Sequence, residues 1–153
     1  MKKILIIGVG SIGKRYLQIL TKKKIFVGIY DKKKTNLAVN NFLIFKNFKE
    51  IKRWCPDAVI ISTTANSHSA ILKKFKKINT KLFLIEKPLT LGKKDAELVK
   101  IFSKKYKKKI YMVSNLRFLY PIKKIKKIIK SLGRPLYSHI YYNHNFINSK
   151  SKF

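Results

Sequence analysis

Residues 8–13 read Gly-Val-Gly-Ser-Ile-Gly, the spacing G-x-G-x-x-G, directly after an apolar run and at the start of an amphipathic stretch. In such a turn Gly8 would permit the tight bend, Gly10 would let backbone approach a pyrophosphate, and Gly13 would let helix and strand pack closely. The phosphates would lie at the helix N-terminus, where backbone N–H groups point outward. An ordinary glycine turn is the alternative, so the neighbouring residues decide between the two.

Asp31 ends the next predicted strand, 18 residues after Gly13. A carboxylate at this point could accept hydrogen bonds from an adenosine ribose and would repel a 2′-phosphate, which favours NAD over NADP. Lys32, Lys33 and Lys34 could stabilise that phosphate, so we expect a moderate preference for NAD, with NADP as a possible cofactor. A surface aspartate without a ligand is the alternative.

Polar side chains also follow two later strands. Ser62, Thr63, Asn66 and His68 come after an apolar strand, at the strand end where open α/β sheets bind ligands. Asn66 or Ser67 could equally be a helix N-cap, and a lone histidine such as His68 is more often structural than catalytic. Glu86-Lys87-Pro88 follows the next strand.

The elements that would position these residues alternate along the chain. We expect strands at 3–7, 25–30, 43–45, 58–62, 82–85 and 110–114, and helices at 11–23, 35–42, 48–54, 67–78 and 93–106. The first helix is expected to pack through Ile12, Tyr16, Ile19 and Leu20. This alternation predicts a Rossmann-type α/β fold with a doubly wound parallel sheet. An amphipathic helix carrying Phe118, Ile122, Ile125, Ile129 and Leu132 follows, and then a strand at 135–146.

Composition narrows the class of protein. The chain has 153 residues, of which 46% are hydrophobic, so it can bury a core and is not disordered. Its single cysteine and three histidines exclude a disulfide scaffold and a structural zinc site, and we expect no bound metal. No apolar run reaches the roughly 20 residues that span a bilayer. We expect a cytoplasmic protein with no membrane partner.

The charge is the main reason to consider nucleic acid as a partner. The chain has 37 Lys+Arg against 6 Asp+Glu, a net charge of +31. The lysines are spread in short groups along the whole chain, and arginine, which reads bases by bidentate contacts, is rare. We therefore favour a solvated lysine surface over a specific nucleic-acid site, which stays as a third, weaker alternative.

Several of these motifs occur together and in order. The glycine turn, the segment from Asp57 to His68 and Glu86-Lys87-Pro88 resemble the Gfo/Idh/MocA oxidoreductases, relatives of glucose–fructose oxidoreductase and inositol 2-dehydrogenase. Asn115-Leu116-Arg117-Phe118 resembles the segment by which that family leaves its nucleotide domain, and residues 131–135 resemble the opening of its second domain. Thr64 is a departure, because relatives usually carry proline there.

The resemblance implies a role for each matching residue. Gly8, Gly10, Ser11, Ile12 and Gly13 would hold the pyrophosphate of NAD, and Asp31 the ribose. The nicotinamide side would be lined by Ser62, Thr63, Asn66 and His68, with Glu86 on the nicotinamide or its ribose. Lys87 would be the catalytic residue, polarising the reacting oxygen of a sugar, nucleotide-sugar or polyol. Asn115 and Arg117 would border the cleft.

The family's second domain is the largest expected departure. The sequence predicts a dinucleotide-binding domain at 1–117 and, at 118–153, the beginning of a truncated substrate and oligomerisation domain. The family's catalytic histidine lies in that domain, and His139 and His144 come too early to be it. The chain could therefore be a dehydrogenase, a non-catalytic NAD-binding remnant, or a fragment of a split enzyme that needs a complementary chain. Alone, we expect it to bind NAD weakly, to self-associate through 118–146, and to lack turnover.

Overall fold

The computed structural model describes residues 2–23, 25–32, 41–134, 136, 137, 139 and 141. The chain divides into two compact units, Met1–Ser114 and Asn115–Phe153, and each is described by itself. The predicted helix at 35–42 falls largely outside the described residues, as does most of the predicted strand at 135–146. His144, Lys33 and Lys34 also lie outside them.

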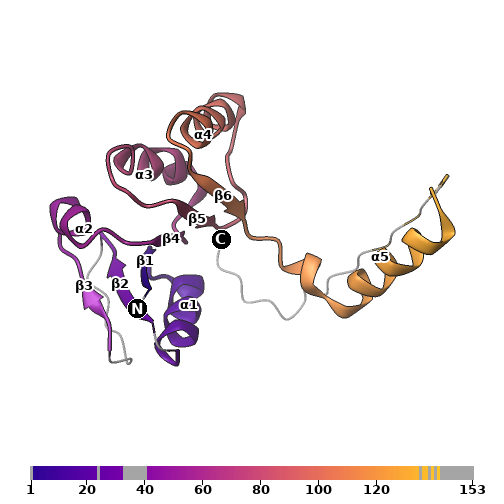
Figure 1. Cartoon of the computed structure of the whole chain (residues 1–153), viewed down its shortest axis with the longest axis horizontal. Coiled ribbons are helices and arrows are strands. Elements are labelled where there is room, and N and C mark those ends of the chain that lie inside the picture. The colour runs from indigo at the N-terminus through magenta and orange to yellow at the C-terminus, as the bar shows by residue number, and fades with distance from the viewer. Residues whose placement is uncertain are drawn as a thin grey trace, which may run out of the picture. The chain divides into compact units, whose positions relative to one another are not determined.

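The first unit is built on a six-stranded parallel sheet in the order β3-β2-β1-β4-β5-β6 (Figure 1). Chain order runs outward from β1 in one direction as far as β3 and then from β4 in the other direction as far as β6. The order therefore reverses between β1 and β4, which pair directly from Ile4 with Ala58 to Ile7 with Ile61. The strands are β1 (Lys3–Ile7), β2 (Phe26–Tyr30), β3 (Leu43–Ile44), β4 (Ala58–Ile61), β5 (Leu82–Ile85) and β6 (Lys109–Met112).

Helices cover both faces of this sheet, but unequally (Figure 1). Helix α1 (Ser11–Thr21) lies on one face, where Leu17 is buried with Ile6, Val27 and Ile29. The opposite face carries α2 (Phe48–Trp54), α3 (His68–Lys74) and α4 (Lys93–Lys105). A short 3₁₀ turn, η1 (Ala65–Ser67), precedes α3.

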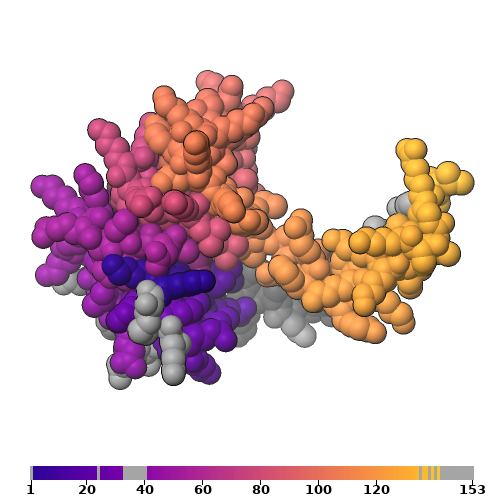
Figure 2. Space-filling view, viewed as in Figure 1, coloured from indigo at the N-terminus to yellow at the C-terminus, as the bar shows by residue number. Residues whose placement is uncertain are grey.

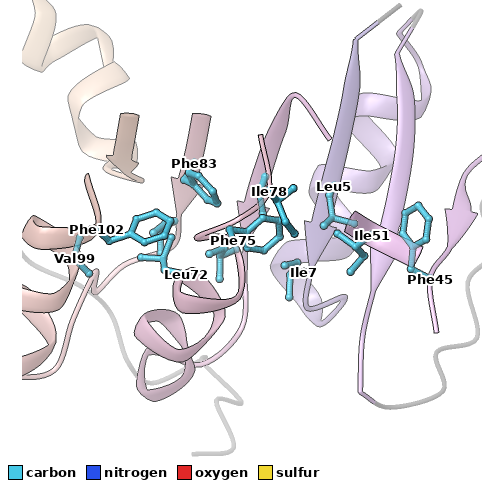
Figure 3. Packing of buried hydrophobic residues seen from close by; sticks show 13 residues of the cluster. Leu5, Ile7, Phe45, Ile51, Leu72, Phe75, Ile78, Phe83, Val99 and Phe102 are labelled. Carbon is cyan, nitrogen blue, oxygen red and sulfur yellow. The ribbon is translucent and has the colours of Figure 1, made fainter. Parts of the chain in front are cut away.

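A line of aromatic rings forms much of the larger core cluster. Phe75 contacts Phe48 on one side and Phe83 on the other, both edge to face with ring centroids 5.6 and 5.4 Å apart. Phe83 meets Phe102 in the same way at 5.7 Å. Figure 3 shows Phe75, Phe83 and Phe102, together with Leu5, Ile7 and Ile51 of the same cluster. Burial of these apolar side chains stabilises the sheet, and the sheet in turn fixes the positions of the strand ends.

The predicted Rossmann-type α/β fold is confirmed, with six strands close to their expected places. The predicted helix at 67–78 is shorter than expected, because η1 precedes α3 and the helix ends at Lys74. The predicted buried face of α1 is wrong in part. Gly13 and Leu17 are its buried residues, whereas Ile12 and Ile19 are 40% and 55% exposed. Close packing at Gly13 turns that stripe of the helix toward the sheet.

The second unit contains a 3₁₀ turn, η2 (Asn115–Phe118), and α5 (Tyr120–Leu132). The predicted amphipathic helix is thus present, and Gly133 is its C-cap. Its apolar stripe is open to solvent, since Phe118 is 68% and Leu132 79% exposed, and none of the residues of α5 is buried. Figure 2 shows the atoms of α5, in orange to yellow, at the surface of this unit.

Within the described ranges, no helix is both long enough and apolar enough to cross a membrane. The same residues contain no group of three or more histidine, cysteine or acidic side chains placed to hold a metal ion.

Candidate cofactor-binding site

The predicted site residues of the first unit gather where the strand order reverses. β1 leads into Gly8, β2 into Asp31, β4 into Ser62 and β5 into Glu86, and these four strands are neighbours in the sheet. Backbone hydrogen bonds continue past the strands, with Ser62 N–H donating to Ile7 O and Glu86 N–H to Ile61 O, both at 2.9 Å. Parallel strands bring all their carboxyl ends to one edge, and ligands of open α/β sheets bind at such a reversal.

The glycine turn is packed tightly against the end of β4. Gly8 has a φ of 88°, in the left-handed region that favours glycine. A Cβ on Gly8 would lie 2.7 Å from Thr63 Cγ2 and 2.9 Å from the Thr63 nitrogen. A Cβ on Gly13 would overlap the Gly8 carbonyl oxygen and would lie 2.9 Å from Ser62 Oγ. These two glycines are therefore required by the fold, whether or not a ligand is bound.

Gly10 differs, because its Cβ would meet no atom of the chain within 4 Å. Its φ of −70° is open to any residue, so the fold does not require glycine here. Gly10 is the N-cap of α1 and supplies no capping side chain, and the first turn of α1 contains no acidic residue. The result is an open space beside the exposed N-terminus of a helix, which suits a phosphate group.

Asp31 is tied to the glycine turn. Its Oδ2 accepts a hydrogen bond of 2.6 Å from the Val9 N–H, and the residue is partly buried. The Gly8 N–H donates to Tyr30 O at 2.9 Å, so β2 holds the turn by two neighbouring bonds. The carboxylate expected to hold a ribose therefore also fixes the loop that would hold the phosphates.

Ser62 and Thr63 form the opposite wall of the turn. Ser62 Oγ donates to Gly8 O at 2.7 Å, and this bond connects the end of β4 with the glycine turn. Ser67 Oγ lies 2.7 Å from Thr63 Oγ1 and 2.8 Å from Thr64 O. Exposed Asn66 accepts at 2.7 Å from Thr64 Oγ1. Ser67 is the N-cap of α3, as the alternative reading allowed, but its side chain makes no capping bond to that helix.

His68 lies behind this wall rather than on its surface. The residue is 1% exposed, with Nε2 3.0 Å from Thr63 O and Nδ1 3.3 Å from Leu89 O. A neutral imidazole has a single N–H, so it donates to one of these carbonyls at a time. The ring connects Thr63, after β4, with Leu89, after the cis Lys87–Pro88 bond. In this position His68 supports the segment that follows β4.

Glu86 has a partner that the sequence motifs did not indicate. Tyr16 Oη donates to Glu86 Oε1 at 2.6 Å, and the Lys87 N–H donates to Glu86 Oε2 at 3.3 Å. Burial and the neighbouring Glu86 raise the pKa of Tyr16 well above its usual value, so the phenol keeps its proton. The side chain of Lys87 is exposed. The only sequence signal for this contact is a tyrosine one turn after the G-x-G-x-x-G pattern, and the expected packing of the first helix already accounts for that residue.

Asn115 and Arg117 lie in η2 of the second unit, and both are exposed. Their predicted place at the border of the cleft stays a prediction.

Comparison with protein families supplies the identification. Residues 2–114 match the Gfo/Idh/MocA family, described as an oxidoreductase family with an NAD-binding Rossmann fold. The chain belongs to this family. The resemblance of its motifs to Gfo/Idh/MocA oxidoreductases is thereby confirmed, as is the prediction of an NAD-binding Rossmann domain. A comparison with curated proteins found no match.

Solved structures show the same fold. The UDP-N-acetylglucosamine 3-dehydrogenase of Acidithiobacillus ferrooxidans is 20% identical, with a TM-score of 0.69 over 82% of this chain and 42% of that one. The WlbA dehydrogenase of Thermus thermophilus, in complex with NAD and UDP-GlcNAcA, is 17% identical, with a TM-score of 0.70 over 86% and 47%. The myo-inositol 2-dehydrogenase of Lactobacillus plantarum is 20% identical, at 0.69 over 85% and 41%. The chain thus spans between 41% and 47% of these proteins.

The open space at Gly10 fits a bound dinucleotide and yields a first prediction. Gly10→Val should fold like the unaltered chain but fill the space where the pyrophosphate must approach. We expect the Kd for NADH, measured by fluorescence titration, to rise at least tenfold, which is about 1.4 kcal/mol.

Gly13→Ala is the matched comparison, because its added methyl group meets the Gly8 carbonyl. We expect it to lower the free energy of unfolding by roughly 1–3 kcal/mol, measured in urea. Unchanged NADH affinity in folded Gly10→Val would show that the pyrophosphate lies elsewhere.

Proposed function

We propose that this chain is the cofactor-binding part of a dehydrogenase that moves hydride between NAD and a hydroxyl or carbonyl carbon of a sugar, nucleotide-sugar or polyol. One observation carries the proposal. The glycine turn, Asp31, Ser62 and the Glu86-Lys87 pair follow four neighbouring strands at the point where the strand order reverses. Such a reversal with chemically different groups at each strand end can bind an extended ligand in one orientation.

The cofactor is assigned to these groups from one end to the other. Ser11 and Ile12, with the three glycines, would present backbone N–H groups to the pyrophosphate, and Asp31 would face the adenosine ribose. Thr63 and Ser62 would face the nicotinamide side, with exposed Asn66 at the rim and His68 behind them. Glu86 would bind the nicotinamide or its ribose. Asn115 and Arg117 are proposed to border the same cleft.

Lys87 is the proposed catalytic residue. NAD, when bound, supplies the carbon that accepts or returns the hydride. The ammonium group of exposed Lys87 would donate a hydrogen bond to the reacting oxygen of the substrate and would polarise it. That oxygen loses its proton as an alcohol is oxidised and gains one in the reverse direction, so a titratable group beside it is needed.

The substrate class rests on the proposed role of Lys87 at a substrate oxygen and on the ligands named for the similar structures. Two of these are named for nucleotide-sugar ligands or substrates and one for myo-inositol, and all are polyhydroxylated compounds. We place the reaction in the cytoplasm, since nicotinamide cofactors are held inside cells.

A second candidate is a chain that holds NAD without turnover, or a part that requires a complementary chain. His68 is the only histidine of the first unit, and both its ring nitrogens face backbone carbonyls. No imidazole of this unit is therefore available to exchange a proton with Lys87. Assays for NADH formation, with and without a complementary second-domain chain, distinguish the two candidates.

Lys87→Met gives the test of the catalytic assignment. Methionine keeps the length of the side chain but cannot polarise an oxygen. In assays with a complementary second-domain chain, we therefore expect hydride transfer to fall by a factor on the order of 10²–10⁴. NADH affinity should stay within about twofold, because Lys87 is assigned to the substrate. Lys94→Met, on exposed α4, is the control and should change neither quantity. Turnover that survives in Lys87→Met would remove the lysine from the mechanism.

Asp31 gives the test of cofactor choice. We expect the unaltered chain to bind NADH more tightly than NADPH, because the carboxylate repels a 2′-phosphate. Asp31→Asn keeps an oxygen for the Val9 N–H but removes the charge, so the preference should narrow while the loop stays in place. Asp31→Ser should narrow or invert the preference and also weaken binding of both cofactors. Tighter binding of NADPH by the unaltered chain at physiological salt would refute the role of Asp31.

The exposed stripe of α5 gives a prediction about self-association. A contiguous apolar surface on a helix favours contact with another chain. Ile125 and Ile129 are 50% and 40% exposed, and we expect the double change Ile125→Lys, Ile129→Lys to shift sedimentation toward the monomer. Ile101→Lys, at a 49% exposed isoleucine of α4, should leave the distribution unchanged. A monodisperse monomer in the unaltered chain would refute the prediction.

A further inference from the structure

Tyr16 connects two parts of the candidate site that are far apart in sequence. It lies on α1, one turn after the glycine pattern, and its hydroxyl donates to Glu86 Oε1 at 2.6 Å across 70 residues. Its ring packs on the cluster formed by Ile6, Leu17 and other buried residues between α1 and the sheet. The hydroxyl is therefore held at a fixed place by an anchored ring, and it reaches the end of β5.

The Glu86 carboxylate is held by donors on both oxygens. Tyr16 binds Oε1, and the Lys87 N–H lies 3.3 Å from Oε2. A short bond from a phenol to a carboxylate is stronger than one between neutral groups. Because a glutamate side chain otherwise samples many rotamers, these two bonds restrict the direction in which its remaining lone pairs point.

We propose that Tyr16 is a positioning residue, which fixes the Glu86 carboxylate in the orientation that receives the nicotinamide half of the cofactor. The inference rests on the proposed function. Tyr16 itself touches no reacting atom, because its proton is committed to Glu86. Its effect should therefore appear only for ligands that reach Glu86.

Two ligands separate this role from a structural one. NADH carries the nicotinamide nucleoside that would meet Glu86, whereas ADP keeps the adenosine and the pyrophosphate but ends before it. In Tyr16→Phe we expect the Kd for NADH to rise about three- to tenfold and the Kd for ADP, measured by calorimetry, to stay within twofold. Unchanged ADP binding also shows that the variant is folded.

A double-mutant cycle tests whether Tyr16 acts through Glu86. In a Glu86→Ala background, Tyr16→Phe should have no further effect on NADH binding, because the group to be positioned is gone. Tyr106→Phe is the matched control, since Tyr106 is a partly buried tyrosine of the other core cluster. It should bind both ligands like the unaltered chain.

The outcomes are distinct. Equal losses for NADH and ADP in Tyr16→Phe would show a structural role and overturn the inference. So would unchanged NADH affinity, or an effect that persists in Glu86→Ala. If the unaltered chain bound neither ligand, the proposed function would fail, and the inference would fall with it.

Discussion

The contact between the Gly8 carbonyl and Gly13 is the constraint on which the site depends. It lets α1 begin so close to the end of β1 that any side chain at Gly13 would overlap the turn. Ser62 Oγ binds the same carbonyl, so β4 is joined to the contact as well. The helix N-terminus, the open space at Gly10 and the ends of two central strands are placed by one close approach of backbone to backbone.

Much of this arrangement could be predicted from the sequence, because the signals are local. A buried apolar run followed by a spaced glycine pattern indicates β1, the turn and α1, and the alternation of six predicted strands with helices indicates the sheet. The partners of the side chains could not be predicted. Whether Asp31 binds Val9, whether His68 is buried, and which tyrosine reaches Glu86 depend on tertiary packing between segments 20 to 70 residues apart. Ile12 and Ile19 show the same limit, because hydrophobicity alone did not indicate which face of α1 approaches the sheet.

The few acidic residues carry a disproportionate share of the structural bonds. Asp31 accepts a hydrogen bond from the Val9 N–H, and Asp57 accepts one from the Lys3 N–H. Glu50 accepts one from the Lys46 N–H, and Glu86 accepts one from the Lys87 N–H. The bonds to Asp31, Asp57 and Glu50 are between 2.6 and 2.8 Å long, whereas the main-chain bond to Glu86 is 3.3 Å long. Lysines can vary on the surface, whereas replacing one of these acids would release a loop or a strand end.

Trp54 is the only tryptophan of the chain, and its ring lies against Gly28 of β2 and 5.0 Å from the ring centroid of Phe45. Its intrinsic emission will therefore follow the unfolding of the first unit, without a contribution from the second. The far-ultraviolet circular dichroism, in contrast, includes the helical signal of α5 in the second unit. Optical melting at two wavelengths can thus resolve whether the two units lose their structure in one transition or in two.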